Sequence, residues 1–137
     1  PGPTSGRNYE LFEEMSKDPR AAFVRAQVQL CGGAPRVLCS DAEVAKIVTG
    51  MRDGKAQVTR LAEDPLEMMQ ATPAEGGCQS VILGSPRTTL DNLGKQEKAF
   101  DVVFLPKDLL SGLSPALCSS QCRQIAMESL PAAVKTA

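Results

Sequence analysis

The chain has 137 residues, which is the size of one ordinary domain and too small for a large multidomain enzyme. Apolar residues make up 42% of it, and 15 Lys and Arg stand against 16 Asp and Glu. The composition therefore allows one hydrophobic core, and its net charge gives no indication of nucleic-acid binding or attraction to an anionic membrane. The absence of histidine excludes His-based triads, His general bases and His-metal sites.

The first part of the chain predicts turns followed by helices. Residues 1–6 are rich in Gly and Pro and are interpreted as a linker or cloning remnant. Residues 7–34 are predicted to form a helical extension that ends at Gly32 and Gly33. Its apolar stripe comprises Leu11, Phe12, Met15, Phe23 and Val24. We expect this stripe to pack against the rest of the domain, and a helix that binds a partner is the alternative.

Strand and helix patterns alternate over residues 35–115. The predicted strands are 35–39, 56–61, 78–83 and 100–105, and the predicted helices cover 42–51 and begin at Pro86 and Pro106. Because strands that alternate with helices form parallel sheets, we predict an α/β domain with a small four-stranded parallel sheet flanked by helices on both faces. Residues 116–137 are predicted to be a C-terminal tail or weak helix, with Ile125, Met127 and Leu130 on its apolar side.

The chain has five cysteines, an odd number at irregular spacing, which is typical of reduced thiols inside a cell. Cys118 and Cys122 are four residues apart, but no second pair has zinc-site spacing, so we interpret them as ordinary thiols. Cys39 and Cys78 lie in or beside predicted strands and are expected to act as small apolar side chains. We predict no metal and no cofactor.

The segment from Cys78 to Leu113 has the most specific local pattern. The strand Ser80-Val81-Ile82-Leu83 precedes Arg87-Thr88-Thr89 at a helix start, and the strand Asp101-Val102-Val103-Phe104 precedes Pro106-Lys107-Asp108-Leu109 at another. Upstream, Arg36-Val37-Leu38-Cys39-Ser40 is a strand that ends in a serine. Over residues 35–113 this pattern resembles a BRCT domain, a small module that recognises phosphopeptides or acts as a scaffold, mostly in nuclear proteins.

The resemblance implies a protein-interaction module with no catalytic residues and a nuclear localisation. It implies a phosphate site made of Ser40, the Asp41 backbone N–H, Arg87, Thr88 and Lys95. The implied partners are a phosphorylated protein or peptide and other scaffold proteins. The implied setting is DNA-damage signalling or a chromosome-associated scaffold such as a kinetochore.

Three departures from the family's pattern make the match a divergent one, and the two that add negative charge favour an alternative, a structural BRCT-like scaffold without anion binding. The chain has no Trp for the last helix, Asp41 stands where phosphate-binding members have Gly, and Asp91 stands where they have Lys. Local capping also competes with phosphate binding. Ser40 and Glu43 fit a capping box, and so does the segment Thr88-Thr89-Leu90-Asp91.

A third hypothesis is a Rossmann-like methyltransferase fragment. Glu63 and Asp64 follow the second predicted strand, where such enzymes place an acidic residue on a ribose. Those enzymes also need a Gly-rich turn after the first strand, and here that turn is Cys39-Ser40-Asp41-Ala42-Glu43. The missing glycine weighs against a bound cofactor.

Overall fold

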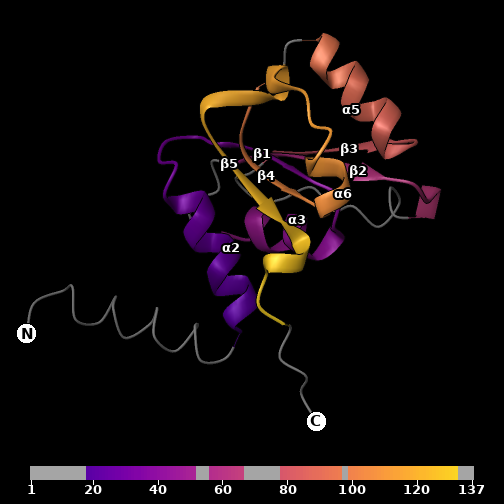
Figure 1. Ribbon diagram of the computed structural model, residues 1–137. Coiled ribbons are helices and arrows are strands. Elements are labelled where there is room, and N and C mark those ends of the chain that lie inside the picture. The colour runs from indigo at the N-terminus through magenta and orange to yellow at the C-terminus, as the bar shows by residue number, and fades with distance from the viewer. Residues whose placement is uncertain (1–17, 52–55, 67–77, 97–98, 133–137) are drawn as a thin grey trace, which may run out of the picture.

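The computed structural model of the chain describes residues 18–51, 56–66, 78–96 and 99–132 (Figure 1). The elements in chain order are α2 (Pro19–Gln29), β1 (Arg36–Cys39), α3 (Ala42–Thr49), β2 (Gln57–Ala62), β3 (Cys78–Leu83), α5 (Pro86–Lys95), β4 (Phe100–Leu105), α6 (Lys107–Leu110), η1 (Pro115–Leu117), β5 (Cys118–Ala126) and η2 (Met127–Ser129). The predicted linker 1–6 and the residues Leu11, Phe12 and Met15 lie outside the described ranges. No helix within those ranges is both long and apolar enough to cross a membrane.

The five strands form one parallel sheet in the order β3-β2-β1-β4-β5. This confirms the predicted α/β class with a parallel sheet, and it corrects the predicted number of strands from four to five. The strands β3 and β4 coincide with the predicted runs 78–83 and 100–105. The order 3-2-1-4-5 is that of a doubly wound sheet, in which the chain starts in the middle and builds outward in both directions.

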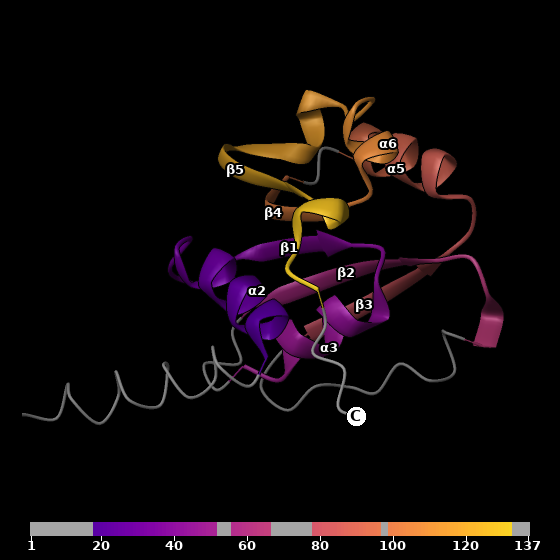
Figure 2. The same ribbon diagram turned by 60° about the horizontal axis from the view of Figure 1, so that its bottom comes forward.

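The two central strands, β1 and β4, are buried on both faces. Side chains on a strand point alternately to its two faces, so each strand supplies two cores. Val37, Cys39, Val102 and Phe104 lie in one core with α2 and α3. The other core contains Leu38, Val103 and Leu105 from the same strands, together with Leu90 and Leu93 of α5. Figure 2 shows α2 and α3 on one side of the sheet and α5 and α6 on the other, as predicted.

The helix α2 is an integral part of the first core. The Asp18 side chain accepts a hydrogen bond from the Ala21 N–H (3.1 Å), and Pro19 occupies the first turn, where its missing N–H costs nothing. Val24 and Val28 are buried against the sheet and α3. This confirms the predicted packing for the described half of the helical extension. After α2 the chain turns through Gly32 and Gly33, whose φ angles of 67° and 59° favour glycine.

The fifth strand, β5, lies within the segment that was predicted to be a tail or weak helix, and that helix prediction is wrong. The pairing of β5 with β4 contains a bulge. Phe100 pairs with Cys118 and Val102 pairs with Arg123, so β5 advances five residues where β4 advances two. The helix prediction rested on Ile125, Met127 and Leu130, but Ile125 lies in β5, and Met127 begins the short 3-10 helix η2.

We predict that replacing Phe104 by Ala lowers the free energy of unfolding by about 3–5 kcal/mol, because Phe104 is the largest fully buried side chain and a cavity would remain. Urea denaturation followed by circular dichroism measures this loss. The control is Leu30→Ala at a side chain that is 67% exposed, for which we expect a change of less than about 0.5 kcal/mol. Similar losses for both variants would contradict the two-core arrangement.

Candidate functional site

The candidate site is the edge of the sheet where the parallel strands end. The chain leaves β1 toward the face covered by α3, and it leaves β4 toward the opposite face, where Leu109 and Leu110 of α6 pack. The strands β1 and β4 are neighbours. The segments that follow them therefore lead to opposite faces of the sheet from adjacent positions. In open α/β sheets, ligands bind in the crevice at such a topological switch point. Ser40 and Asp41 follow β1 directly at this point.

Asp41, and not Ser40, caps the helix α3. Its Oδ2 accepts a hydrogen bond from the Val44 N–H at 3.1 Å. The capping box predicted for Ser40 and Glu43 is therefore wrong, because α3 begins at Ala42 and the N-cap is one residue later than Ser40. The Ser40 side chain is partly exposed and has no hydrogen bond to a described residue. A carboxylate thus occupies the positive end of α3, where an anion would otherwise bind.

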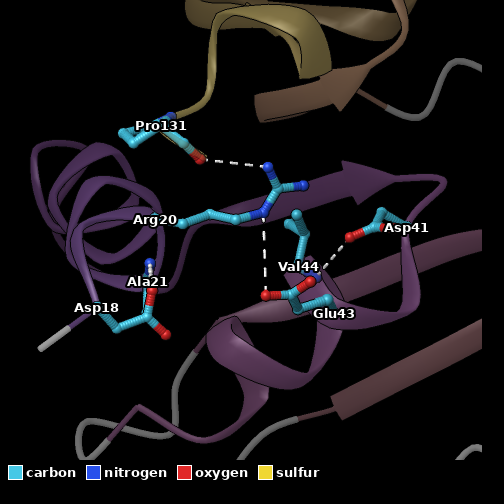
Figure 3. Close-up of polar contacts among 7 residues, drawn as sticks. All are labelled: Asp18, Arg20, Ala21, Asp41, Glu43, Val44 and Pro131. Atoms are coloured by element: carbon cyan, nitrogen blue, oxygen red, sulfur yellow. Dashed lines mark hydrogen bonds and ion pairs between the residues drawn. The ribbon is translucent and has the colours of Figure 1, made fainter. Parts of the chain in front are cut away.

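Arg20 of α2 connects this helix start to the C-terminal part of the chain (Figure 3). Its Nε lies 3.9 Å from Oε1 of Glu43, and its Nη1 donates a hydrogen bond to the carbonyl oxygen of Pro131 at 3.3 Å. The Arg20 side chain is only 18% exposed. The neighbouring Leu130 is buried in the same core as α2 and α3. The segment that follows η2 therefore lies against the α2–α3 face, next to the start of α3.

A second carboxylate occupies the start of α6, on the other side of the switch point. Glu128 in η2 accepts hydrogen bonds from the Lys107 backbone N–H at 3.0 Å (Oε1) and 3.3 Å (Oε2). Lys107 is the first residue of α6, and Pro106 before it has no side-chain donor or acceptor to offer. Both helix starts beside the switch point are thus bound to carboxylates of the chain itself. Neither is open to a phosphate without displacement of a carboxylate.

Arg87, the arginine of the predicted phosphate site, contacts α6. Its Nη2 donates a hydrogen bond to the carbonyl oxygen of Asp108 at 2.9 Å. Its Nη1 lies so close to Gly112 that a Cβ there would be 2.6 Å away. Arg87 and Thr88 are exposed in the first turn of α5, and Lys95 is exposed in its last turn.

The capping box predicted for Thr88-Thr89-Leu90-Asp91 is also wrong. The helix α5 begins at Pro86, its N-cap is Ser85 without a side-chain hydrogen bond, and Thr88 lies inside the first turn. Thr89 is buried under the strand-to-helix connection, where a Cβ on Gly84 would meet its Oγ1 at 3.4 Å. Gly84 has a φ of 150°, which favours glycine.

The structure separates the predicted phosphate-site residues into two groups. Ser40 and Asp41 lie at the start of α3, while Arg87, Thr88 and Lys95 lie on α5, which packs on the opposite face of the sheet. The strand β2 also lies between β1 and β3, from which the two helices start. Sequence reasoning missed Arg20, Lys107 and Glu128, because their contacts join segments that are far apart in the chain.

The acidic residues of the enzyme hypothesis do lie at this edge. Glu63 and Asp64 follow β2, the neighbour of β1, and both are exposed. Asp64 accepts a hydrogen bond from the Leu66 N–H at 2.9 Å, which makes it part of a local turn. The connection from β1 to α3 consists of Ser40 and Asp41 alone. It has no glycine that would let a cofactor approach the backbone.

The cysteine at the end of β1 and the acidic residues of the described ranges bear on reactivity and metal binding. Burial raises the pKa of the Cys39 thiol to about 12, so Cys39 stays protonated and is a packing residue, as predicted. Within the described ranges, no group of three or more Cys, Asp or Glu side chains is arranged to hold a metal ion.

Comparison with protein families, with characterised proteins and with solved structures finds no match to this chain.

We predict that Asp41→Ala lowers the free energy of unfolding by about 1 kcal/mol, because the Val44 N–H loses its acceptor at the helix start. The matched control is Ser40→Ala at the adjacent hydroxyl, for which we expect a loss of less than about 0.5 kcal/mol. Urea denaturation of both variants measures the difference. A larger loss for Ser40→Ala would show that Ser40 is the cap.

Proposed function

We propose that this domain is a protein-interaction module without catalytic activity. One observation carries the proposal, namely the difference between the two edges of its sheet. Among the described residues, β3 pairs only with β2 and β5 pairs only with β4, so each has one edge that no described strand covers. Edge strands present unpaired backbone groups that can bind another chain unless the edge is blunted.

The β5 edge is blunted. A bulge interrupts its register with β4, and exposed polar residues such as Arg123 and Gln124 follow the bulge. Both devices are common ways to prevent edge-to-edge association.

The β3 edge has neither device. Its pairing with β2 is regular over all six residues, from Gln57 with Cys78 to Ala62 with Leu83. The strand has no charged residue, and Leu83 at its end is 42% exposed. Leu66, which follows the adjacent strand β2, is 62% exposed. An extended segment of a partner protein fits such an edge, since added backbone hydrogen bonds give affinity and apolar side chains give specificity.

The closed switch point supports a role without catalysis. Carboxylates of Asp41 and Glu128 occupy the two helix starts, and the β1–α3 connection lacks glycine. These features disfavour a nucleotide, a dinucleotide or a methyl-donor cofactor at the place where such sheets bind them. The BRCT resemblance supports the same general function and a nuclear scaffold as its setting.

We expect Leu83→Asp to abolish binding of the protein partner, because a charge would lie next to the added strand. Partners that co-purify with the full chain are identified by mass spectrometry, and the direct interaction is then measured with the purified partner. The matched control is Leu30→Asp, a second exposed leucine that is remote from β3. If Leu83→Asp binds the purified partner as tightly as the parent chain does, the β3 edge is not the interaction site.

The enzyme hypothesis has its own test. We expect S-adenosylmethionine, NAD and ATP to leave the melting temperature of the full chain unchanged, because the switch point is occupied by the chain's own groups. A ligand at 100 times its Kd would stabilise the fold by roughly 2.7 kcal/mol, which is a readily measured shift. Such a shift with any of the three would contradict a role without a cofactor.

Phosphopeptide recognition is the second candidate function, and the position of Ser40 favours it. Because Asp41 caps α3, the Ser40 hydroxyl is not engaged as a cap and can donate to a phosphate. NMR titration with inorganic phosphate and a phosphoserine peptide tests this. Shifts at the Ser40 and Asp41 amides that disappear in Ser40→Ala would establish it. Unchanged spectra would leave a scaffold domain without an anion site.

A further inference from the structure

Cys118 and Cys122 are brought together by the bulge in β5. Four residues apart in a regular strand, their Cα atoms would be separated by about 13 Å, at ~3.3 Å per residue. A disulfide requires a Cα separation below about 7 Å. The three additional residues of β5 between its pairings with Phe100 and Val102 fold the strand back over this stretch. Cys118 lies opposite Phe100 and Arg123 lies opposite Val102, so chain positions five apart stand opposite positions two apart on β4, and Cys122 directly precedes the second pairing.

We propose that Cys118 and Cys122 are a reversible oxidation site, at which hydrogen peroxide converts the two thiols of the β5 bulge into a disulfide. Both thiols are reduced in the structure and both are partly exposed, so an oxidant can reach them. Cys31 and Cys39 differ in this respect. Cys39 is fully buried, and the Cys31 thiol donates to the backbone oxygens of Gln27 and Asp101.

The surroundings assign different roles to the two sulfurs. The Gln124 Nε2 lies 3.2 Å from the Cys118 sulfur and donates a hydrogen bond to it. Because this donor is beside Cys118 and not beside Cys122, we assign Cys118 as the sulfur that attacks the oxidant. Burial, the contact with Cys118 and the nearby Asp101 carboxylate raise the pKa of Cys122 to about 12, so Cys122 remains a thiol at neutral pH.

The chemistry has two balanced steps. In the first, the Cys118 sulfur attacks hydrogen peroxide, the O–O bond breaks, and a sulfenic acid and water form after uptake of one proton. In the second, the Cys122 sulfur attacks the Cys118 sulfur, the S–O bond breaks, and the leaving hydroxide takes the Cys122 proton as water. Overall, two thiols lose two hydrogen atoms and one peroxide becomes two water molecules.

The test uses the full chain, reduced first and then treated with hydrogen peroxide. Trypsin cleaves after Lys107 and Arg123, and the peptide 108–123 contains Cys118 and Cys122 and no other cysteine. We expect this peptide to become lighter by two hydrogen atoms and to resist alkylation until it is reduced again. If both cysteines remain alkylatable when Cys31 is already oxidised, or if Cys31 is joined to either of them, the proposal is wrong.

Single substitutions distinguish the cysteine that attacks peroxide from the cysteine that then closes the disulfide. In Cys122→Ser, we expect Cys118 to stop at a sulfenic acid that dimedone traps. In Cys118→Ser, we expect Cys122 to stay alkylatable under the same peroxide treatment. Gln124→Ala is expected to slow formation of the disulfide roughly threefold to tenfold, the effect of one lost hydrogen bond. Cys31→Ser is the matched control and should leave the rate unchanged. Dimedone trapping at Cys122 in place of Cys118 would overturn the assignment of the nucleophile.

Discussion

The burial of β1 and β4 on both faces is the constraint on which the rest of the structure depends. Val37, Leu38 and Cys39 in β1, and Val102 through Leu105 in β4, have no exposed surface, so each face of the sheet needs a cover of helices. A strand buried in this way has no polar face, and its backbone groups are satisfied only by neighbours on both sides. The helices α2 and α3 cover one face, and α5 covers the other. The connections from β1 and β4 must therefore diverge, and this divergence creates the switch point.

At the switch point, the chain uses its own groups where ligand-binding sheets leave helix starts open. Asp41 binds the first turn of α3, Glu128 binds the first residue of α6, and Arg20 holds the carbonyl of Pro131 beside Glu43. Each of these contacts contributes little to the stability of the whole fold, since a hydrogen bond is worth about 0.5–1.5 kcal/mol, and about 1.5–3 kcal/mol when one partner is charged. Together they place two carboxylates at the positions an anion would take. For this reason we propose the β3 edge, and not the ends of the strands, as the place where a partner binds.

Much of the fold could be predicted from the sequence because its signals are local. Apolar runs bounded by Gly, Pro or Ser define β3 and β4 to the residue, and Pro86 marks the start of α5. The strand β5 could not be predicted, because its bulge interrupts the alternation of apolar and polar residues by which a strand is identified. The capping error at Ser40 has a similar origin. Ser40 and Asp41 can both cap a helix, and the start of α3 at Ala42 decides between them.

The contacts that close the switch point were beyond prediction for a different reason. Arg20 and Pro131 are 111 residues apart, and Lys107 and Glu128 are 21 residues apart on either side of a mispredicted strand. Periodicity and spacing cannot pair residues across such distances. The residues of the predicted phosphate site lie on two helices, α3 and α5, and the strand order places β2 between the strands that precede these helices.

Hydrogen exchange at the Val44 and Lys107 amides, followed by NMR on the full chain, tests the closure of the switch point most directly. Their acceptors are the carboxylates of Asp41 and Glu128, so both amides should exchange more slowly than the Thr88 amide. Thr88 is the internal reference because it lies in the first turn of α5, where Ser85 provides no side-chain cap. Slow exchange at Val44 and Lys107 would show that the chain's own carboxylates occupy both helix starts. Exchange as fast as that of Thr88 would show that the helix starts are open to a ligand.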